Sequence, residues 1–316
     1  MYWLKLVRWQ NLIIVFLTQL LAWGCVMLPI ESYSNQVLLL QWHNFLLLAI
    51  STVLIAAAGY IINDYFDIKI DIINRPQKVI LEKRIPLRMA IIAHTVLNVI
   101  GILLAASVAR QAGHYSLVLL QVGCTVMLWF YSTTFKKQFI TGNVVVALLT
   151  SFTIITLMLY EPAIQYFATQ PPFIVTPQNK IPNPVWVLGI YTCFAFTLTW
   201  MREIVKDMED FKGDAQEGCV TMPIRWGLLR SSRFTQAIGI ITLVPLITGA
   251  IKLLMADRIL LGVYTIVTLA APIIGLIIYL PTKATSKHYN DCSRWLKIIM
   301  VAGIGSLIIY YFQAHA

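Results

Sequence analysis

Long apolar segments separated by short polar ones dominate the sequence. The apolar runs cover residues 11–30, 44–63, 87–109, 115–134, 140–160, 185–203, 235–254, 259–280 and 295–312. Each run is near or above the roughly 18–20 residues that an α-helix needs to cross a bilayer. The pattern therefore predicts an all-α polytopic membrane protein with nine transmembrane helices.

Composition supports this class. Hydrophobic residues make up 59% of the 316 residues and charged residues only 12%, about half of what a soluble domain carries. No polar linker is long enough to hold a separate soluble domain, so we expect one intramembrane domain over residues 1–316. The first apolar run is long and lacks a clear small-residue cleavage site, which favours an uncleaved first helix over a signal peptide.

The basic residues predict an orientation. With the N-terminal segment counted as the first, the odd-numbered polar segments hold twenty of the 24 Lys and Arg residues. The even-numbered segments hold only Arg110, Lys180, Lys252 and Arg258. Lys and Arg concentrate in cytoplasmic loops, so this split places the N-terminus in the cytoplasm. It also supports the helix count, because a missed helix would mix the two sets.

The net charge of +10 has a membrane explanation. In a soluble protein such an excess would favour nucleic-acid binding. Here it is typical of membrane orientation and of contact with anionic lipid headgroups. We therefore expect membrane lipids as partners and no nucleic acid, and nothing in the sequence implies a protein partner.

Two acidic clusters stand at the ends of apolar runs on the predicted cytoplasmic side. The first, Asn63, Asp64, Asp67 and Asp71, follows the second run, and its four-residue spacing places three of these side chains on one side of a helix. The second, Asp207, Asp210 and Asp214, follows the sixth run with spacing that predicts one helix face. Clustered carboxylates beside hydrocarbon are costly unless a cation holds them.

These clusters suit a magnesium–diphosphate site. Mg²⁺ prefers a few carboxylates plus phosphate oxygens, and Asn63 could add a neutral oxygen. Basic residues on the same side could bind the remaining phosphate charge: Arg75, Lys78, Lys136, Lys137, Lys206 and Lys212. Apolar walls would hold a hydrocarbon tail. Together these features indicate transfer of an allylic group from its diphosphate.

Simpler interpretations exist for the individual features. One Asp-x-x-Asp pattern can be only a solvated helix end, whereas two clusters in helical phase on one side favour a site. Four aromatic residues nearby could stabilise a cation, although packing or an interfacial belt is the commoner role: Tyr60, Tyr65, Tyr131 and Trp200.

The clusters resemble known signatures. Asn63-Asp64-x-x-Asp67-x-x-x-Asp71 with the following Asn-Arg-Pro, and Asp207-x-x-Asp210-x-x-x-Asp214, are similar to the two signatures of the UbiA-type intramembrane prenyltransferases. Smaller features resemble the family too: Arg8-x-x-Asn11, Tyr131-Ser132 with Lys136, and Gly142-Asn143. The resemblance runs from about residue 5 to residue 310.

The resemblance implies nine helices around a cavity open to the cytoplasm and membrane, and Mg²⁺-dependent prenyl transfer. By the same resemblance, Asn63, Asp67, Asp210 and Asp214 form the main Mg²⁺–diphosphate set. Asp64, Asp71 and Asp207 support it, and Asp71 and Asp207 are further candidate metal ligands. The expected substrate-binding residues are Asn11, Arg75, Lys78, Tyr131, Lys136, Asn143, Lys206 and Lys212.

The acceptor is predicted less directly. The segment Arg202–Asp214, with Thr221-x-Pro223-Ile and Gly227, resembles the branch that makes digeranylgeranylglyceryl phosphate. This implies a polyprenyl diphosphate donor and a lipophilic, phosphorylated acceptor, geranylgeranylglyceryl phosphate. After Asn74-Arg75-Pro76, however, the chain reads Gln-Lys-Val-Ile where many members repeat Arg-Pro. Prenylation of a quinone precursor or of haem stays open, as does a divalent-cation or lipid-phosphate transporter.

Overall fold

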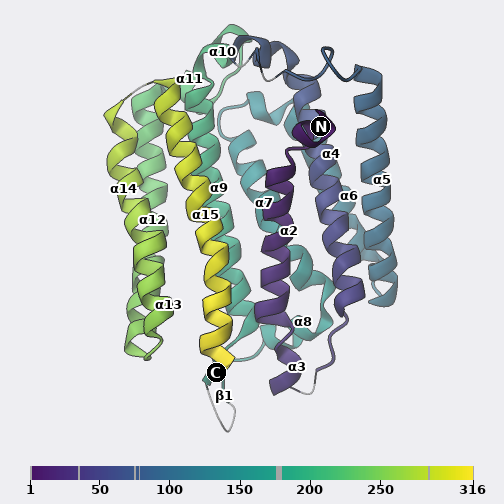
Figure 1. Ribbon diagram of the computed structural model, residues 1–316, viewed down its shortest axis with the longest axis vertical. Coiled ribbons are helices and arrows are strands. Elements are labelled where there is room, and N and C mark those ends of the chain that lie inside the picture. The colour runs from purple at the N-terminus through teal and green to yellow at the C-terminus, as the bar shows by residue number, and fades with distance from the viewer. Residues whose placement is uncertain are drawn as a thin grey trace. The chain divides into compact units, whose positions relative to one another are not determined.

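The structure is a computed structural model that describes residues 2–34, 36–74, 76–77, 79–175, 180–283 and 285–315, and it is almost entirely helical (Figure 1). The α-helices are α1 (Tyr2–Leu6), α2 (Trp9–Ala22), α3 (Ile30–Tyr33), α4 (Trp42–Asn74), α5 (Leu87–Gln111), α6 (Val118–Thr133), α7 (Thr141–Tyr160), α8 (Pro162–Ala168), α9 (Pro184–Glu209), α10 (Phe211–Gln216), α11 (Met222–Trp226), α12 (Leu228–Met255), α13 (Ile259–Tyr264), α14 (Ala271–Tyr279) and α15 (Ser286–His315). Two π-helical segments, η1 (Trp23–Met27) and η4 (Thr265–Ala270), and three 3₁₀ turns, η2 (Tyr115–Leu117), η3 (Phe135–Lys137) and η5 (Leu280–Thr282), join them.

Nine helical segments in the described residues are long and apolar enough to cross a membrane. They are Trp9–Tyr33, Trp42–Asn74, Leu87–Gln111, Tyr115–Thr133, Thr141–Tyr160, Pro184–Glu209, Leu228–Met255, Ile259–Tyr279 and Ser286–Ala314. The predicted all-α fold and its nine spans are confirmed. Two short strands, β1 (Phe173–Val175) and β2 (Lys180–Pro182), form an antiparallel pair that no sequence pattern predicted.

Helix α4 is longer than the apolar run that predicted it. The run ends at residue 63, but the helix continues through the first acidic cluster to Asn74, for 33 residues in all. Ile70 is still buried in this extension, so the extended part keeps one apolar side. Pro76 stands two positions after the last helical residue, a position typical of proline because it cannot continue a helix.

The chain divides into two compact units. Unit 1 consists of Met1–Lys136 and Phe152–Gly189, and unit 2 of Lys137–Ser151 and Ile190–Ala316. The chain passes between the units three times, between Lys136 and Lys137, within α7 and within α9. The single domain expected over residues 1–316 stays a prediction.

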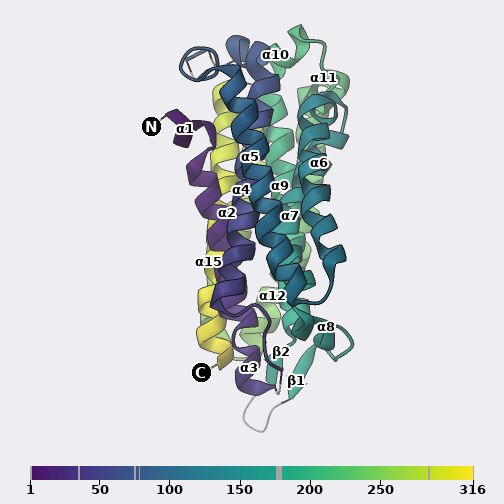
Figure 2. The ribbon, with the colours of Figure 1, turned by 90° about the vertical axis from the view of Figure 1, so that its right-hand side faces the viewer.

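Unit 1 is organised around α4, which packs against α2, α5 and α6 (Figures 1 and 2). Helices α4 and α5 approach closely at Gly101, whose carbonyl oxygen accepts a 2.6 Å hydrogen bond from Ser51 Oγ. Further along, a ring nitrogen of the buried His94 on α5 lies 3.0 Å from the carbonyl oxygen of Ala58. These polar contacts fix the position of α4 along α5.

Glu161 fixes the end of unit 1 where α4 begins. Its side chain is fully buried, and its carboxylate accepts backbone N–H groups from Leu39 at 3.2 Å, Leu40 at 2.8 Å and Ala163 at 3.1 Å. The segment before α4 is thereby held against the start of α8. Because the charge is shared among three donors, a buried carboxylate is tolerated here.

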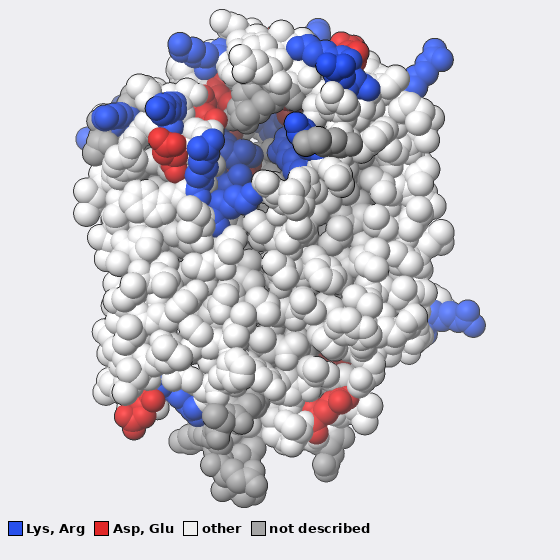
Figure 3. Space-filling view, in the orientation of Figure 1, with Lys and Arg blue, Asp and Glu red and all other residues white. Residues whose placement is uncertain are grey.

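In unit 2, the apolar side of α9 forms the centre of the core. Its Leu198, Met201, Ile204 and Val205 belong to one buried cluster with residues of α12, α14 and α15. In the face drawn in Figure 3, charged side chains lie mainly near helix ends, and the surface along the helices is almost free of charge. This distribution suits helices that lie in hydrocarbon.

We expect Gly101→Ala to destabilise the protein. A Cβ at this position would lie 2.9 Å from Ile55 Cγ1 and 3.1 Å from the carbonyl oxygen of Ser51, and a backbone oxygen cannot rotate away. Overpacking of this kind costs about 1–3 kcal/mol, so thermal unfolding in detergent should begin at a lower temperature.

Gly123→Ala, in α6, is the matched control. Nothing lies within 4 Å of the Cβ it would add. Alanine also has a higher helix propensity than glycine, so this variant should melt at or above the wild-type temperature. Equal melting of Gly101→Ala and wild type would contradict the close approach of α4 and α5.

Candidate active site

Asn63 and Asp67 lie on the same side of α4, as their spacing predicted. Asn63 Nδ2 donates a 2.8 Å hydrogen bond to Asp67 Oδ2 one turn further along the helix. Both side chains are half-buried. The contact holds the Asn63 amide beside the Asp67 carboxylate.

Lys136 neutralises Asp67. Its Nζ forms an ion pair with Asp67 Oδ1, and the two side chains are only 9% and 16% exposed. Lys136 lies in η3, directly after α6, and α6 packs against α4. The predicted substrate-binding lysine is therefore in direct contact with a predicted metal ligand.

The amide oxygen of Asn63 is the unusual atom of this cluster. Asn63 Oδ1 is buried and has no hydrogen-bond partner among the described residues. A buried oxygen without a partner costs about 1–3 kcal/mol, so its persistence at this position calls for a ligand. A hard cation is the ligand that such an oxygen and the neighbouring Asp67 carboxylate would share.

Asp64 has a different partner. Arg8 Nη2 lies 2.7 Å from Asp64 Oδ1, and the Arg8 guanidinium lies over the Tyr60 ring at 5.0 Å. Arg8 adopts a left-handed backbone conformation with φ 52°, which is unfavourable for a non-glycine residue. Desolvation opposes the charge of Arg8, but the carboxylates of Asp64 and Asp67 and the Tyr60 side chain outweigh it and raise the pKa of Arg8.

Arg8 was not among the predicted site residues. Its only sequence signal was the Arg8-x-x-Asn11 pattern, which says nothing about a contact with a residue 56 positions later. The pair leaves Asp64 with its charge satisfied at the edge of the cluster.

The second acidic cluster is not on one continuous helix, so that prediction was wrong. Helix α9 ends at Glu209, and Asp210 lies between α9 and α10 with φ −92° and ψ 7°. Asp214 follows on α10 and is 8% exposed. Aspartate competes with the backbone for hydrogen bonds and favours helix ends, which explains the interruption at Asp210.

Asp214 and Glu203 each still lie close enough to Asp207 to repel its charge. Asn143 Nδ2, from the start of α7, donates a 2.8 Å hydrogen bond to Asp207 Oδ2. Asn143 is thus a partner of a predicted metal ligand. Glu203 was missed as a site residue, although it precedes Asp207 by one helical turn.

The remaining predicted residues divide into three groups. Lys206 pairs with Glu203, and Lys212 is exposed on α10. Half-buried positions are occupied by Asn11, Asp71 and Tyr131. Arg75 and Lys78 lie outside the described residues.

The oxygen donors of the two acidic clusters are of the kind that Mg²⁺ prefers. In the described part of the chain, no three His, Cys, Asp or Glu side chains already form a group that could hold a metal ion. The carboxylates instead use Arg8, Lys136 and Asn143 as partners. The all-oxygen donor set and the unpaired Asn63 Oδ1 fit Mg²⁺.

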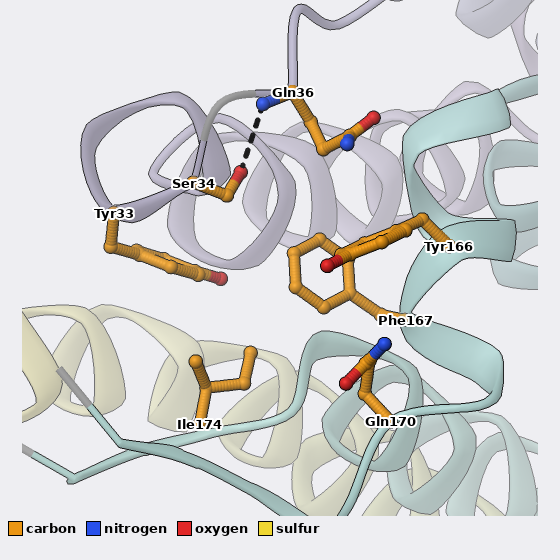
Figure 4. A pocket seen from close by; sticks show the side chains of 7 residues that line it. All are labelled: Tyr33, Ser34, Gln36, Tyr166, Phe167, Gln170 and Ile174. Carbon is orange, nitrogen blue, oxygen red and sulfur yellow. Dashed lines mark hydrogen bonds between the residues drawn. The ribbon is translucent and has the colours of Figure 1, made fainter.

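A pocket of about 310 Å³ lies elsewhere in unit 1 (Figure 4). It is lined by Tyr33, Ser34, Gln36, Tyr166, Phe167, Gln170 and Ile174. It lies at the end of unit 1 where α4 begins, roughly 35–40 Å along α4 from Asp67 at 1.5 Å per residue. Without a charged lining residue, it does not suit a diphosphate.

In the described ranges, nine apolar helical segments, two of which carry acidic clusters at or just beyond one end, define an integral, multi-pass membrane protein with a candidate cation–anion site. The model of the UbiA prenyltransferase family matches residues 32–301. The chain belongs to the UbiA prenyltransferase family and is a prenyltransferase.

The chain is similar in sequence to enzymes that share one name. The chain is 28% identical over 261 residues to the digeranylgeranylglyceryl phosphate synthase of Methanosphaera stadtmanae, a match that covers 82% of this chain and 85% of the relative. It is 29% identical over 275 residues to the enzyme of the same name from Saccharolobus solfataricus, covering 85% and 86%.

Solved structures share the fold. One structure, described in terms of digeranylgeranylglyceryl phosphate synthase in membranes, has a TM-score of 0.64 at 22% identity and covers 99% of this chain and 98% of that one. A UbiA homolog from Archaeoglobus fulgidus, bound to GPP and Mg²⁺, has a TM-score of 0.56 at 14% identity and covers 98% and 100%. At these identities the similarity shows the fold alone.

We expect Lys136→Gln to make the metal-free protein less stable and more responsive to Mg²⁺. Removing one partner of a mostly buried ion pair leaves the Asp67 charge uncompensated, which costs about 3–5 kcal/mol at most for this partly exposed pair. Thermal unfolding with EDTA should therefore shift downward. Added Mg²⁺, without any substrate, should raise the unfolding temperature of the variant more than that of the wild type.

The neighbouring Lys137→Gln is the control. Its side chain is exposed, and the same titration should leave it indistinguishable from wild type. If Lys136→Gln unfolds at the wild-type temperature in EDTA, Lys136 is not the counter-ion that stabilises Asp67.

Proposed function

We propose that this enzyme transfers a geranylgeranyl group from geranylgeranyl diphosphate to the free hydroxyl of geranylgeranylglyceryl phosphate. The main structural support for this proposal is the buried Oδ1 of Asn63, which has no hydrogen-bond partner among the described residues and lies beside the Asp67 carboxylate near the end of an apolar helix. This pair has the chemistry to hold a cation on a diphosphate. The names of the relatives support the choice of both substrates.

The diphosphate is held through Mg²⁺ and through lysines. Bound Mg²⁺ supplies positive charge that stabilises the diphosphate as a leaving group. The residues that would hold it are Asn63, Asp67 and Asp71 from unit 1 and Asp207, Asp210 and Asp214 from unit 2. The Mg²⁺-bound complex of the Archaeoglobus homolog supports this chemistry.

Lys136 has two roles in this scheme. Before substrate binds, it neutralises Asp67. If the carboxylates held a cation, the Lys136 ammonium group would be available to bind a diphosphate oxygen. Arg75, Lys78 and Lys212 are the further proposed contacts of the diphosphate. Lys206 is a proposed contact of the phosphorylated acceptor, and Asn11 and Tyr131 are proposed neighbours of the substrate. Asp64 keeps its pairing with Arg8 and supports α4.

The bond changes are those of an allylic substitution. The bond between the first prenyl carbon and the diphosphate oxygen breaks, and diphosphate leaves with the electron pair. The acceptor hydroxyl oxygen attacks the same carbon, an ether bond forms, and the hydroxyl proton is released. Apolar side chains exclude water, which would otherwise consume the allylic cation.

The Lys and Arg distribution supports a location of these residues on the cytoplasmic side of the membrane, with the N-terminus on that side. Transport is the less favoured function. Transporters usually hold their ion-binding groups near the bilayer midplane on interrupted helices. Here Asp67 and Asp207 lie in the last turns of long helices.

Asp67→Asn and Asp210→Asn should each lower kcat for prenyl transfer by at least about 100-fold, because each removes a charge that holds the metal and its diphosphate. Purified enzyme with geranylgeranyl diphosphate and Mg²⁺ would be assayed by mass spectrometry of the lipid product. Exposed Glu217→Gln is the control. Normal turnover by either Asp variant removes that residue from the proposed set.

A panel of acceptors tests the assignment of the second substrate. Product is expected with geranylgeranylglyceryl phosphate, and little or none with a hydroxybenzoate, a naphthoate or haem. EDTA should abolish turnover and Mg²⁺ should restore it. Product with only an aromatic acid or a naphthoate would replace the ether-lipid assignment by quinone-precursor prenylation, while product with haem alone would indicate haem modification.

A further inference from the structure

A compact charged cluster lies on α9 about one helical turn before the second acidic cluster. At its centre is Glu203, which is 6% exposed. Lys206 Nζ donates to both of its carboxylate oxygens at 3.1 and 2.9 Å, and Arg202 Nη1 donates at 3.2 Å. One buried carboxylate therefore binds two cations.

Arg202 retains unused binding capacity. Its Nε is buried and has no hydrogen-bond partner in the part of the chain that the structure describes. A guanidinium carries five N–H donors, and a buried donor of a charged group is costly when it is left unpaired. This atom indicates that an acceptor group belongs beside Arg202.

A third cation adds to the positive charge. Lys297 on α15 is half-buried and lies close enough to Arg202 for their charges to repel. Asp207 also lies near Lys206, but its Oδ2 already accepts the hydrogen bond from Asn143. Arg202, Lys206 and Lys297 thus bring three positive charges near one another, and Glu203 is the carboxylate that Arg202 and Lys206 bind.

We infer that Arg202, Lys206 and Lys297 bind the phosphate monoester of the lipid acceptor, with Glu203 as the counter-ion that the phosphate displaces. This inference rests on the proposed function, because it assigns a binding site to the phosphate of that acceptor. An arginine fork matches the geometry of phosphate oxygens, and a dianionic phosphate would balance the excess charge.

The position on α9 separates this phosphate from the diphosphate. Arg202 precedes Asp207 by five residues, roughly 7 Å along the helix axis, toward the apolar part of α9. Glu203 carries a negative charge and would repel a diphosphate bound directly beside it, so the diphosphate is expected nearer to Asp207 than to Glu203. The cluster therefore selects an acceptor that carries its own phosphate and disfavours neutral acceptors.

Two variants with opposite expected effects test the inference. Arg202→Gln should raise KM for geranylgeranylglyceryl phosphate about tenfold or more, since it removes a charge-assisted contact. It should leave KM for geranylgeranyl diphosphate and the slow turnover of geranylgeranylglycerol within about twofold. Glu203→Gln removes the carboxylate that competes with the phosphate, so it should lower KM for the phosphorylated acceptor.

Arg233→Gln is the matched control, because Arg233 is an exposed arginine of the same unit with no ion pair among the described residues. Arg233→Gln should leave unchanged the KM for geranylgeranylglyceryl phosphate, the KM for geranylgeranyl diphosphate and the turnover of geranylgeranylglycerol. Thermal unfolding of each variant checks folding. If Arg202→Gln does not fold, the direction of the Glu203→Gln effect decides the inference.

Direct binding separates this inference from the proposed function. A short-chain alkylglyceryl phosphate, added without donor or Mg²⁺, should raise the unfolding temperature of the wild type but not that of Arg202→Gln. The inference is overturned if the alkylglyceryl phosphate raises the unfolding temperature of both proteins equally, or if Arg202→Gln raises KM for geranylgeranyl diphosphate. It is also overturned if Arg202→Gln impairs turnover of geranylgeranylglyceryl phosphate and of geranylgeranylglycerol equally. Failure of the proposed function would instead be seen in the wild type, as binding without transfer.

Discussion

The structure depends on how carboxylates are kept at the ends of apolar helices. An ionised carboxylate beside hydrocarbon is strongly unfavourable without a partner. In unit 1, Asp64 and Asp67 are paired with Arg8 and Lys136, which come from segments far away in the sequence. The same pairs fix the N-terminal segment and the end of α6 to α4, so charge compensation and helix placement are one constraint.

The two units meet this constraint differently. Beside its acidic cluster, unit 1 leaves a neutral oxygen, Asn63 Oδ1, without a hydrogen-bond partner among the described residues. Unit 2 leaves a cationic donor, Arg202 Nε, without a hydrogen-bond partner in the part of the chain that the structure describes. An unpaired oxygen attracts a cation, whereas an unpaired guanidinium donor attracts an anion. Among the unsatisfied buried atoms of the described residues, these two lie beside the acidic clusters and indicate ligands of opposite charge, as expected of an enzyme that binds a metal ion and phosphorylated substrates.

Local features of the site were predictable where they depend on helix periodicity. Asn63 and Asp67 share one side of α4 because residues four apart are neighbours on any helix. The predicted single face of Asp207, Asp210 and Asp214 was wrong, since α9 ends before Asp210. Helix ends depend on local competition for hydrogen bonds, which an apolar-run pattern does not contain.

The sequence by itself determined the class of the protein, the nine spans and the family signatures, because bilayer thickness and helix periodicity act on continuous stretches of chain. Only the tertiary structure decided which cation neutralises which carboxylate. Arg8 and Asp64 are 56 positions apart, and Lys136 and Asp67 are 69 apart. Such pairings follow from the packing of helices against α4, and no local pattern encodes them.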